Sequence, residues 1–328
     1  MQNAPFVSVI MPIRNEACYI ERSLGSVLDQ DYPHDRMEVL VVDGMSDDGT
    51  RKVVQYICER TSQLCVTLLD NPSRIVPPAL NIGLRHARGE IIVRVDGHCE
   101  IEPDYVRRCV AALHETGADN VGGLQQAIGT TPVADAIALA TSSPFGVGGA
   151  RFHYATQPAW VDTVYLGAYR REIFDRIGGF DEELVRNQDD ELNFRLTQAG
   201  GKIWLDPSIR SVYYSRAGLR KLWRQYFQYG FYKVRVMQKR GGVASWRHLV
   251  PGAFVLSLLA SVLIAFVTRK PRWLLSVAGP YAAANVAAST WAGRHSPSIL
   301  PLLPAIFATL HCAYGLGFLV GLWHWRGR

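Results

Sequence analysis

Short apolar runs alternate with amphipathic stretches over the first hundred residues of the chain. Runs rich in valine and isoleucine are typical of buried strands, and they lie at residues 6–13, 37–42, 64–69 and 91–95. Helical patterns occupy the stretches between them, at about residues 16–29, 51–61 and 79–87. A regular alternation of strand and helix predicts an α/β fold with parallel strands, right-handed crossovers and flanking helices.

Polar side chains follow three of these apolar runs. Asn15 and Glu16 follow the first run, Asp43 follows the second, and Asp96 and His98 follow the fourth. Open α/β sheets bind their ligands at the carboxyl ends of the strands, so these side chains are candidates for a binding site. Asp43 alone is open to two interpretations, as a turn and helix-capping residue or as a hydrogen-bond acceptor for a base or sugar.

The Asp96-Gly97-His98 turn combines a carboxylate and an imidazole. Carboxylate oxygens suit Mg²⁺ and Mn²⁺, and an imidazole shifts the preference toward transition metals, so the pair can hold a divalent cation. A strand-end aspartate is also often only a cap, and the pair alone leaves both interpretations open. No G-x-G-x-x-G motif follows the first run and no G-x-x-x-x-G-K-[ST] motif occurs, so a cation here would replace those phosphate-binding loops.

The last third of the chain is basic at first and then strongly apolar. Residues 216–248 carry much of the excess positive charge, and on a helical wheel most of it lies opposite an aromatic-rich stripe. This pattern is typical of an interfacial membrane helix, although an ordinary surface helix packed on the sheet also shows it. Apolar stretches follow at 249–267, 273–291 and 299–323, of which the first and last are long enough to cross a bilayer.

Composition narrows the choice of partner and compartment. The chain has 328 residues, a formal net charge of +6 and six cysteines. No C-x-x-C pair occurs, which argues for a reducing compartment and against a zinc ribbon or a disulfide framework. Because the positive charge adjoins apolar spans, it favours a membrane surface over nucleic acid.

These patterns predict three parts of the chain. We expect a catalytic domain over 1–215, a basic amphipathic interfacial segment over 216–248, and a membrane domain with two or three hydrophobic helices over 249–328. Within the first part, residues 124–162 contain Gly146, Gly148 and Gly149 and few periodic apolar residues, so we expect a mobile acceptor loop there. The basic stretch before the first apolar span predicts that the catalytic domain is cytoplasmic. Three basic residues in the next loop run against that rule: Arg269, Lys270 and Arg272.

Several motifs, taken in order, resemble those of family 2 glycosyltransferases. They are VIMPIRNE at 9–16, VVDGMSDDGT at 41–50, NIG at 81–83, ARGE at 87–90, DGH at 96–98, GGFDE at 178–182 and DDELNFR at 189–195. The resemblance covers about residues 5–240, and its details are similar to the succinoglycan-biosynthesis, ExoA-like branch of the family. It implies a GT-A fold, which is a mixed sheet flanked by helices that binds a nucleotide-diphospho-sugar.

The resemblance also implies roles for residues in the nucleotide pocket. Pro12 and Glu16 would line the pocket, and Asp43 would bind the uracil together with Arg74. Asp96 would lie at the ribose and the diphosphate.

Metal and base positions follow from the same resemblance. Asp96 and His98 would hold Mn²⁺ or Mg²⁺, with His98 standing where the commonest family pattern, Asp-x-Asp, has its second aspartate. An imidazole carries no charge, so it neutralises the cation less than a carboxylate does. Asp189 matches the aspartate of the family's Glu-Asp motif, in which Gln188 replaces the glutamate, and is the predicted general base. On the residues alone, this acidic run is equally a helix start favoured by the helix dipole.

The function implied by the resemblance is inverting transfer of a hexose. We expect a UDP-sugar donor, a lipid-linked oligosaccharide acceptor in exopolysaccharide or capsule biosynthesis, and no nucleic acid partner. We expect a multi-pass protein of the inner membrane of the cell. Two alternatives stay open: a polyprenyl-phosphate glycosyltransferase, whose acceptor needs little base catalysis, and a non-catalytic membrane scaffold that kept the fold.

Overall fold

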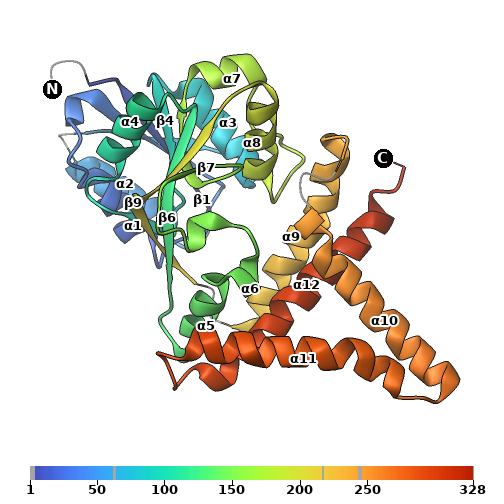
Figure 1. The fold of residues 1–328 in the computed structure, drawn as a ribbon. Coiled ribbons are helices and arrows are strands. Elements are labelled where there is room, and N and C mark those ends of the chain that lie inside the picture. Colours follow the sequence, from blue (N-terminus) through green and yellow to red (C-terminus); the bar gives the residue numbers. More distant parts are fainter. Residues whose placement is uncertain (1–3, 62–63, 216–217, 243–245, 328) are drawn as a thin grey trace. The chain divides into compact units, whose positions relative to one another are not determined.

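The computed structural model describes residues 4–61, 64–215, 218–242 and 246–327. The chain forms two compact units (Figure 1). The first, here called the sheet unit, comprises Met1–Gln126 and Arg151–Tyr213, and the second, the helical unit, comprises Ala127–Ala150 and Tyr214–Arg328. The predicted catalytic range 1–215 thus contains one segment, Ala127–Ala150, that belongs to the helical unit.

The sheet is parallel on one side and antiparallel on the other, as a mixed GT-A sheet is expected to be. Its parallel part has the order β3-β2-β1-β4 and is built from β1 (Val7–Ile13), β2 (Met37–Asp43), β3 (Cys65–Asp70) and β4 (Ile91–Arg94). These four strands confirm the four predicted apolar runs. The antiparallel part continues from β4 through β8 (Tyr165–Arg170), β6 (Asn120–Ile128), β9 (Ile203–Tyr214) and β5 (Cys99–Ile101), while β7 (Ala159–Val161) pairs with β9.

Alternate residues of β1 enter two different cores, because successive side chains of a strand point to opposite faces. Val9 and Met11 lie in the core beneath α1 (Ile20–Leu28) and α4 (Tyr105–Thr116), while Ile10 lies in the core beneath α3 (Val76–His86). The remaining helices of this unit are α2 (Thr50–Arg60), α7 (Glu172–Ile177) and α8 (Gln188–Gln198), and Arg151–His153 and His34–Arg36 are short 3-10 turns. The sheet is therefore buried on both faces, which explains why its strands read as continuous apolar runs.

One expectation for the middle of the chain was wrong. Its glycines and weak periodicity predict an acceptor loop over 124–162, but α5 (Pro132–Thr141) and α6 (Pro144–Val147) form within it. Thr131 caps α5, since its hydroxyl accepts a hydrogen bond from the N–H of Ala134. In the helical unit α5 buries Ile137 and Ala140 against Phe307 and Leu310 of α12 (Leu303–His324), so the apolar residues of this segment serve helix packing.

The helical unit packs around α12, which lies against α9 (Leu219–Lys239) and α10 (Val250–Thr268). Glycines let α9 and α12 approach closely: a Cβ added to Gly317 would lie 2.1 Å from the carbonyl oxygen of Phe227, and one at Gly321 would lie 2.7 Å from that of Phe231. Small residues four apart are a common device for close helix packing. Part of the apolar stripe of α9 thus faces a neighbouring helix, and the interfacial membrane role of 216–248 stays a prediction.

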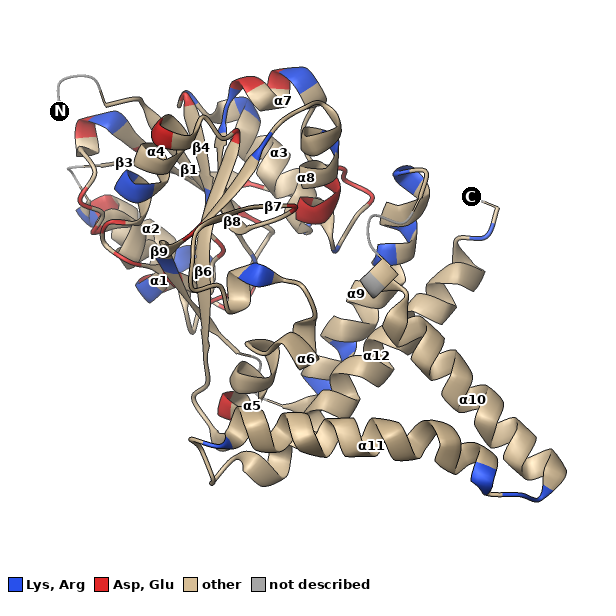
Figure 2. Cartoon of the chain, in the orientation of Figure 1, with Lys and Arg blue, Asp and Glu red and all other residues tan. Residues whose placement is uncertain are grey.

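Two helices of this unit are long and apolar enough to cross a membrane by length and composition: Val250–Thr268 and Leu300–His324. The third predicted apolar stretch forms α11 (Arg272–Gly293), which is not among these candidates. Figure 2 shows α10 without a charged residue along its length and basic residues at the turn that follows it. Two candidate spans are within the predicted number of two or three, and they are weak evidence of a membrane location by themselves.

Candidate active site

The loops that follow β1, β2 and β4 lie together at one edge of the sheet. Ile13 at the end of β1 pairs with Asp43, and the N–H of Gly44 donates to the carbonyl oxygen of Ile13 over 2.8 Å. On the other side of β1, Ile10 pairs with Arg94 at the end of β4. Because parallel α/β sheets bind ligands at the carboxyl ends of their strands, this edge is the candidate site.

Asp43 is buried at this edge and already has several hydrogen-bond partners. Its carboxylate accepts hydrogen bonds from the hydroxyl of Ser46 over 2.5 Å and from the N–H of Ser46 over 3.2 Å. Nη1 of Arg51 lies 3.2 Å from Oδ2 of Asp43 and 2.6 Å from Oδ1 of Asp70. Two carboxylate oxygens accept about four hydrogen bonds, so little capacity is left for a base, and the uracil contact of Asp43 stays a prediction.

Pro12 and Arg74 lie in different surroundings. Pro12 is buried in β1 beside Val42, and its place in a nucleotide pocket stays a prediction. Arg74 is exposed in the loop after β3, where its carbonyl oxygen accepts a hydrogen bond from Nη1 of Arg14 over 3.0 Å. Among the described residues, the arginine that pairs with Asp43 is Arg51, not Arg74.

Glu16 and His98 meet across this edge. The backbone N–H of Glu16 donates to the hydroxyl of Thr50 over 2.8 Å, which fixes the loop after β1. The carboxylate of Glu16 lies 2.9 Å from Nδ1 of His98, and the imidazole also contacts the ring of Tyr213 edge-to-face, with 5.4 Å between the ring centroids. Glu16 therefore orients the imidazole, in the way a carboxylate partner orients a metal-binding histidine.

The donor set around His98 fits a divalent cation. One ligand atom from each of Asp96, His98 and Cys99 lies within 4.8 Å of the others. Sγ of Cys99 lies 2.6 Å from the hydroxyl of Tyr165, and burial raises the pKa of the Cys99 thiol well above its usual value. A thiol that keeps its proton is a poor ligand, so the carboxylate of Asp96 and the imidazole of His98 are the groups that would hold a metal.

Arg94 joins Asp96 to Asp189. Nε of Arg94 donates to Oδ1 of Asp96 over 2.8 Å, and Nη1 donates to Oδ1 of Asp189 in a short contact. Asp189 lies in the first turn of α8, so this pair of contacts ties α8 to the end of β4. The side chain of Arg94 is 9% exposed and that of Asp189 is 35% exposed, which leaves the aspartate accessible to a substrate.

The pKa values of Arg94 and Asp189 are both raised, and in each group burial and the ion pair between them act against each other. Burial opposes the charge on Arg94, but the carboxylates of Asp189 and Asp96 outweigh burial and keep its pKa well above the usual value. Burial raises the pKa of Asp189; Arg94 opposes this effect, and the carboxylates of Asp96 and Asp190 add to it. A carboxylate whose pKa is raised is a better proton acceptor than an ordinary aspartate.

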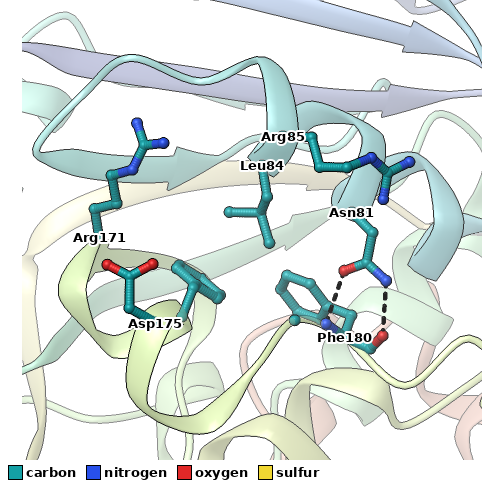
Figure 3. A pocket seen from close by; sticks show the side chains of 8 residues that line it. Asn81, Leu84, Arg85, Arg171, Asp175 and Phe180 are labelled. Carbon is teal, nitrogen blue, oxygen red and sulfur yellow. Dashed lines mark hydrogen bonds between the residues drawn. The ribbon is translucent and has the colours of Figure 1, made fainter.

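A hollow lies between α3 and α7 (Figure 3). It has a volume of about 380 Å³, and its lining includes Asn81, Arg85, Arg171 and Phe180. The side chain of Asn81 donates to the carbonyl oxygen of Phe180 and accepts from its N–H, each over 2.8 Å. Asn81 thereby fixes the turn that leads toward α8, and its contacts are structural.

Comparison with known proteins agrees with this geometry. Residues 8–178 match the model of a family described as "Glycosyl transferase family 2". The chain is 32% identical over 325 residues to the succinoglycan biosynthesis protein ExoA of Rhizobium meliloti, covering 98% of this chain and 96% of the relative. The chain belongs to glycosyl transferase family 2. Within the family it is of the ExoA-like branch, as the motifs predicted.

Other relatives of this glycosyltransferase come from archaea and bacteria. The chain is 27% identical over 332 residues to a Methanococcus voltae enzyme named dolichyl N-acetyl-alpha-D-glucosaminyl phosphate 3-beta-D-2,3-diacetamido-2,3-dideoxy-beta-D-glucuronosyltransferase, covering 97% of each chain. The mannosyltransferase PcManGT of Pyrobaculum calidifontis, solved with GDP-Man and Mn²⁺, has a TM-score of 0.64 at 23% identity and covers 98% of this chain and 88% of its own. At this identity the structural likeness shows the fold, which confirms the GT-A prediction.

Sequence reasoning missed two arginines of the glycosyltransferase site, Arg51 and Arg94. Arg94 interrupts a run of isoleucine and valine in a strand that is buried on both faces. A charge is almost never buried without a partner, so this interruption was a signal that acidic partners converge there. Arg51 carried no comparable signal, because it follows an acidic loop at a helix start where many basic residues are exposed.

Proposed function

We propose that this glycosyltransferase moves a hexose from a UDP-sugar to a lipid-linked saccharide acceptor in exopolysaccharide or capsule assembly, by a metal-dependent inverting reaction. The observation that carries the proposal is the cluster of Arg94, Asp96 and Asp189, in which one arginine joins the proposed metal ligand to the proposed base. Two apolar helices long enough to span a membrane support a lipid-linked acceptor. So does the Methanococcus voltae relative, whose name contains a dolichyl-linked sugar phosphate.

Sugar transfer from a nucleotide requires a stabilised leaving group and an activated acceptor. A divalent cation held by Asp96 and His98 would stabilise the negative charge that develops on the diphosphate. Asp189 would take the proton of the acceptor hydroxyl, since its raised pKa and its exposure suit a general base. One displacement at the anomeric carbon inverts its configuration, so an α-linked donor gives a β-linked product.

The membrane arrangement is part of the same proposal. We place the protein in the inner membrane of the cell as a multi-pass protein, with the sheet unit on the cytoplasmic side, where nucleotide sugars are made. The basic residues of α9 support this orientation, because cytoplasmic segments beside membrane spans are rich in lysine and arginine.

The proposal is tested with membranes that carry the full chain, a panel of labelled UDP- and GDP-sugars, Mn²⁺ or Mg²⁺, and a lipid extract. Label from one UDP-sugar should pass into the organic phase, and Asp189→Asn should lower the rate of this transfer by about 10³-fold. Asp175→Asn, which changes an exposed carboxylate of α7 outside the cluster, is the matched control and should keep it. Transfer from GDP-sugars alone would contradict the donor, release of free nucleotide without organic-phase label would contradict the lipid-linked acceptor, and full activity of Asp189→Asn would contradict the base.

A further inference from the structure

Arg94 occupies an unusual position for an arginine. It is the last residue of β4, a central strand with β1 on one side and β8 on the other. Its backbone is fixed by pairing with Ile10, and its side chain is 9% exposed. A long flexible side chain is thus held on a rigid element, which is the condition for accurate placement of a functional group.

The guanidinium of Arg94 uses two different nitrogens for its two partners. Nε binds Oδ1 of Asp96, and Nη1 binds Oδ1 of Asp189. The planar guanidinium holds its N–H groups at fixed angles, so the position of one carboxylate defines that of the other. Removing the positive charge would leave two neighbouring carboxylates that repel each other.

The contact with Asp189 engages one oxygen of that carboxylate, Oδ1. The same residue stands in the first turn of α8, and among the described contacts Arg94 is what ties its carboxylate to the sheet. The rotation of the carboxylate about its Cβ–Cγ bond is therefore set by Arg94. With Oδ1 occupied, Oδ2 is the oxygen that can accept a proton from a substrate.

We propose that Arg94 is a positioning residue for the transfer step, which holds Asp189 by Oδ1 and so presents Oδ2 to the acceptor hydroxyl. The inference rests on the proposed function, in which Asp189 is the base. In the step itself, the acceptor oxygen forms a bond to the anomeric carbon and its proton passes to Oδ2 of Asp189. The bond between that carbon and the diphosphate oxygen breaks, and its electron pair leaves with the nucleoside diphosphate.

The first test measures kcat for the full chain in membranes with the donor and lipid extract that give transfer. Arg94→Ala should lower kcat by roughly 100-fold, the scale of loss for a misplaced catalytic group. Added guanidinium ion at millimolar concentration should restore part of this loss, because it supplies the missing cation between the two carboxylates. Arg107→Ala, which removes an exposed arginine side chain of α4, is the matched arginine control, and its kcat should be unchanged with and without guanidinium.

The second test combines Arg94→Ala with Asp189→Asn. If Arg94 acts through Asp189, the double variant should be no slower than Asp189→Asn by more than about threefold, because residues that act as a unit are not additive. Fully additive losses together with no rescue by guanidinium would overturn the inference and leave Arg94 as a structural ion pair. Should Arg94→Ala fail to fold, Arg94→Lys replaces it and should lose at least about tenfold in kcat, since a lysine lacks the planar fork.

The two hypotheses fail in different ways. If Asp189→Asn keeps the kcat of the unchanged chain, the base of the proposed function is wrong and this inference is wrong with it. If Asp189→Asn is inactive while Arg94→Ala keeps full kcat, only the positioning role of Arg94 is wrong.

Discussion

Two clusters of arginine and carboxylate lie in the same sheet unit and differ in how completely they are satisfied. The strand-start cluster is Ser8, Glu38 and Arg88, where Ser8 and Glu38 pair across β1 and β2. Oε1 of Glu38 accepts from the hydroxyl of Ser8 over 2.6 Å and from the N–H of Arg88 over 2.8 Å, and Oε2 accepts from Nη2 of Arg88 over 2.7 Å. Its side chain is 4% exposed, so both oxygens are occupied and hidden from solvent.

The strand-end cluster is Arg94, Asp96 and Asp189, and it keeps a carboxylate with spare capacity. Asp189 is 35% exposed and is bound by Arg94 through one oxygen. Glu38 has a pKa below its usual value and Asp189 has one above it, although burial opposes ionisation in both. Buried charge with full pairing stabilises a fold, whereas a buried charge left partly unpaired is poised to exchange a proton. The difference predicts which cluster affects stability and which affects turnover.

The largest expected effect separates the two clusters by activity. Asp189→Asn should lower kcat by about 10³-fold, within the range for loss of a general base. Its melting temperature should change by only a few degrees, because Arg94 keeps its ion pair with Asp96 when asparagine removes the charge of Asp189. Turnover assays check the kcat and thermal unfolding checks the melting temperature. A large fall in both would show that Asp189 stabilises the fold, as Glu38 of the strand-start cluster does.

Metal binding should give the next largest effect. A chelator should abolish transfer, and His98→Ala should lower the apparent affinity for Mn²⁺ by roughly 10- to 100-fold, the usual effect of weakening a metal site. The matched control is His86→Ala, an exposed histidine on α3. Titration of activity with Mn²⁺ measures the shift, and an unchanged metal requirement in His98→Ala would remove His98 from the metal site.

Glu38→Gln tests the strand-start cluster. It should lower the free energy of unfolding by about 2 kcal/mol, because it removes the charge from a carboxylate that accepts several strong hydrogen bonds. The kcat of the folded fraction should be unchanged, since the cluster lies at the opposite ends of the strands from Asp96. Chemical unfolding and an activity assay at low temperature check both statements, and a reduced kcat with unchanged stability would contradict the comparison.

The smallest effect concerns pH. Burial would raise the pKa of Glu38, but hydrogen bonds from Ser8 and Arg88 outweigh burial and lower it. The carboxylate of Glu38 then binds a proton less readily in the folded chain than in the unfolded chain, whose glutamates titrate at about pH 4.3. The stabilisation is complete above that pH and is lost as the pH falls through the lower folded value. Glu38→Gln should reduce the fall in the free energy of unfolding between neutral and acid pH. If the fall is unchanged in this variant, other carboxylates cause it.

The catalytic activity should also fall in acid, but it should fall at a higher pH than the contribution of Glu38 to stability. The pKa of Asp189 is raised, so the base loses activity at a higher pH than an ordinary aspartate would. The acid limb of kcat/KM should therefore lie above about pH 4. A profile in which kcat/KM falls only below about pH 4 would contradict the raised pKa of Asp189.

Local patterns were sufficient for the parallel part of the sheet, β1 to β4, and for the residues that end its strands, but they did not predict the antiparallel strands β5 to β9. The runs that form β1 and β4 are apolar because both faces of the strands are buried, and such runs are visible without a structure. Glu16, Asp96 and His98 could be placed at one edge because parallel strands end together. The pairing of Glu16 with His98 and of Arg94 with Asp189 could not be predicted, because each joins loops or helices far apart in the chain.

The helices within residues 124–162 were also not predicted from the sequence. Residues 124–162 have weak periodicity because α5 is buried on several sides against other helices of the helical unit, so no single apolar stripe is needed. The family resemblance implies that Arg74 binds the uracil together with Asp43, and this stays a prediction. The arginine that contacts Asp43 among the described residues is Arg51, because α2 begins immediately after the acidic loop.

The discontinuous make-up of the helical unit has a consequence for anyone who wants a detachable catalytic fragment. The chain enters this unit at Ala127–Ala150, leaves it, and enters it again at Tyr214. Part of the core of the unit combines Ile137 from the first segment with Phe307 from the second. A truncation after β9 would delete α12 but retain α5 with its apolar surface uncovered, a surface of the kind that drives aggregation. A catalytic fragment without the C-terminal helices therefore requires redesign of two segments, Ala127–Ala150 and the end of β9.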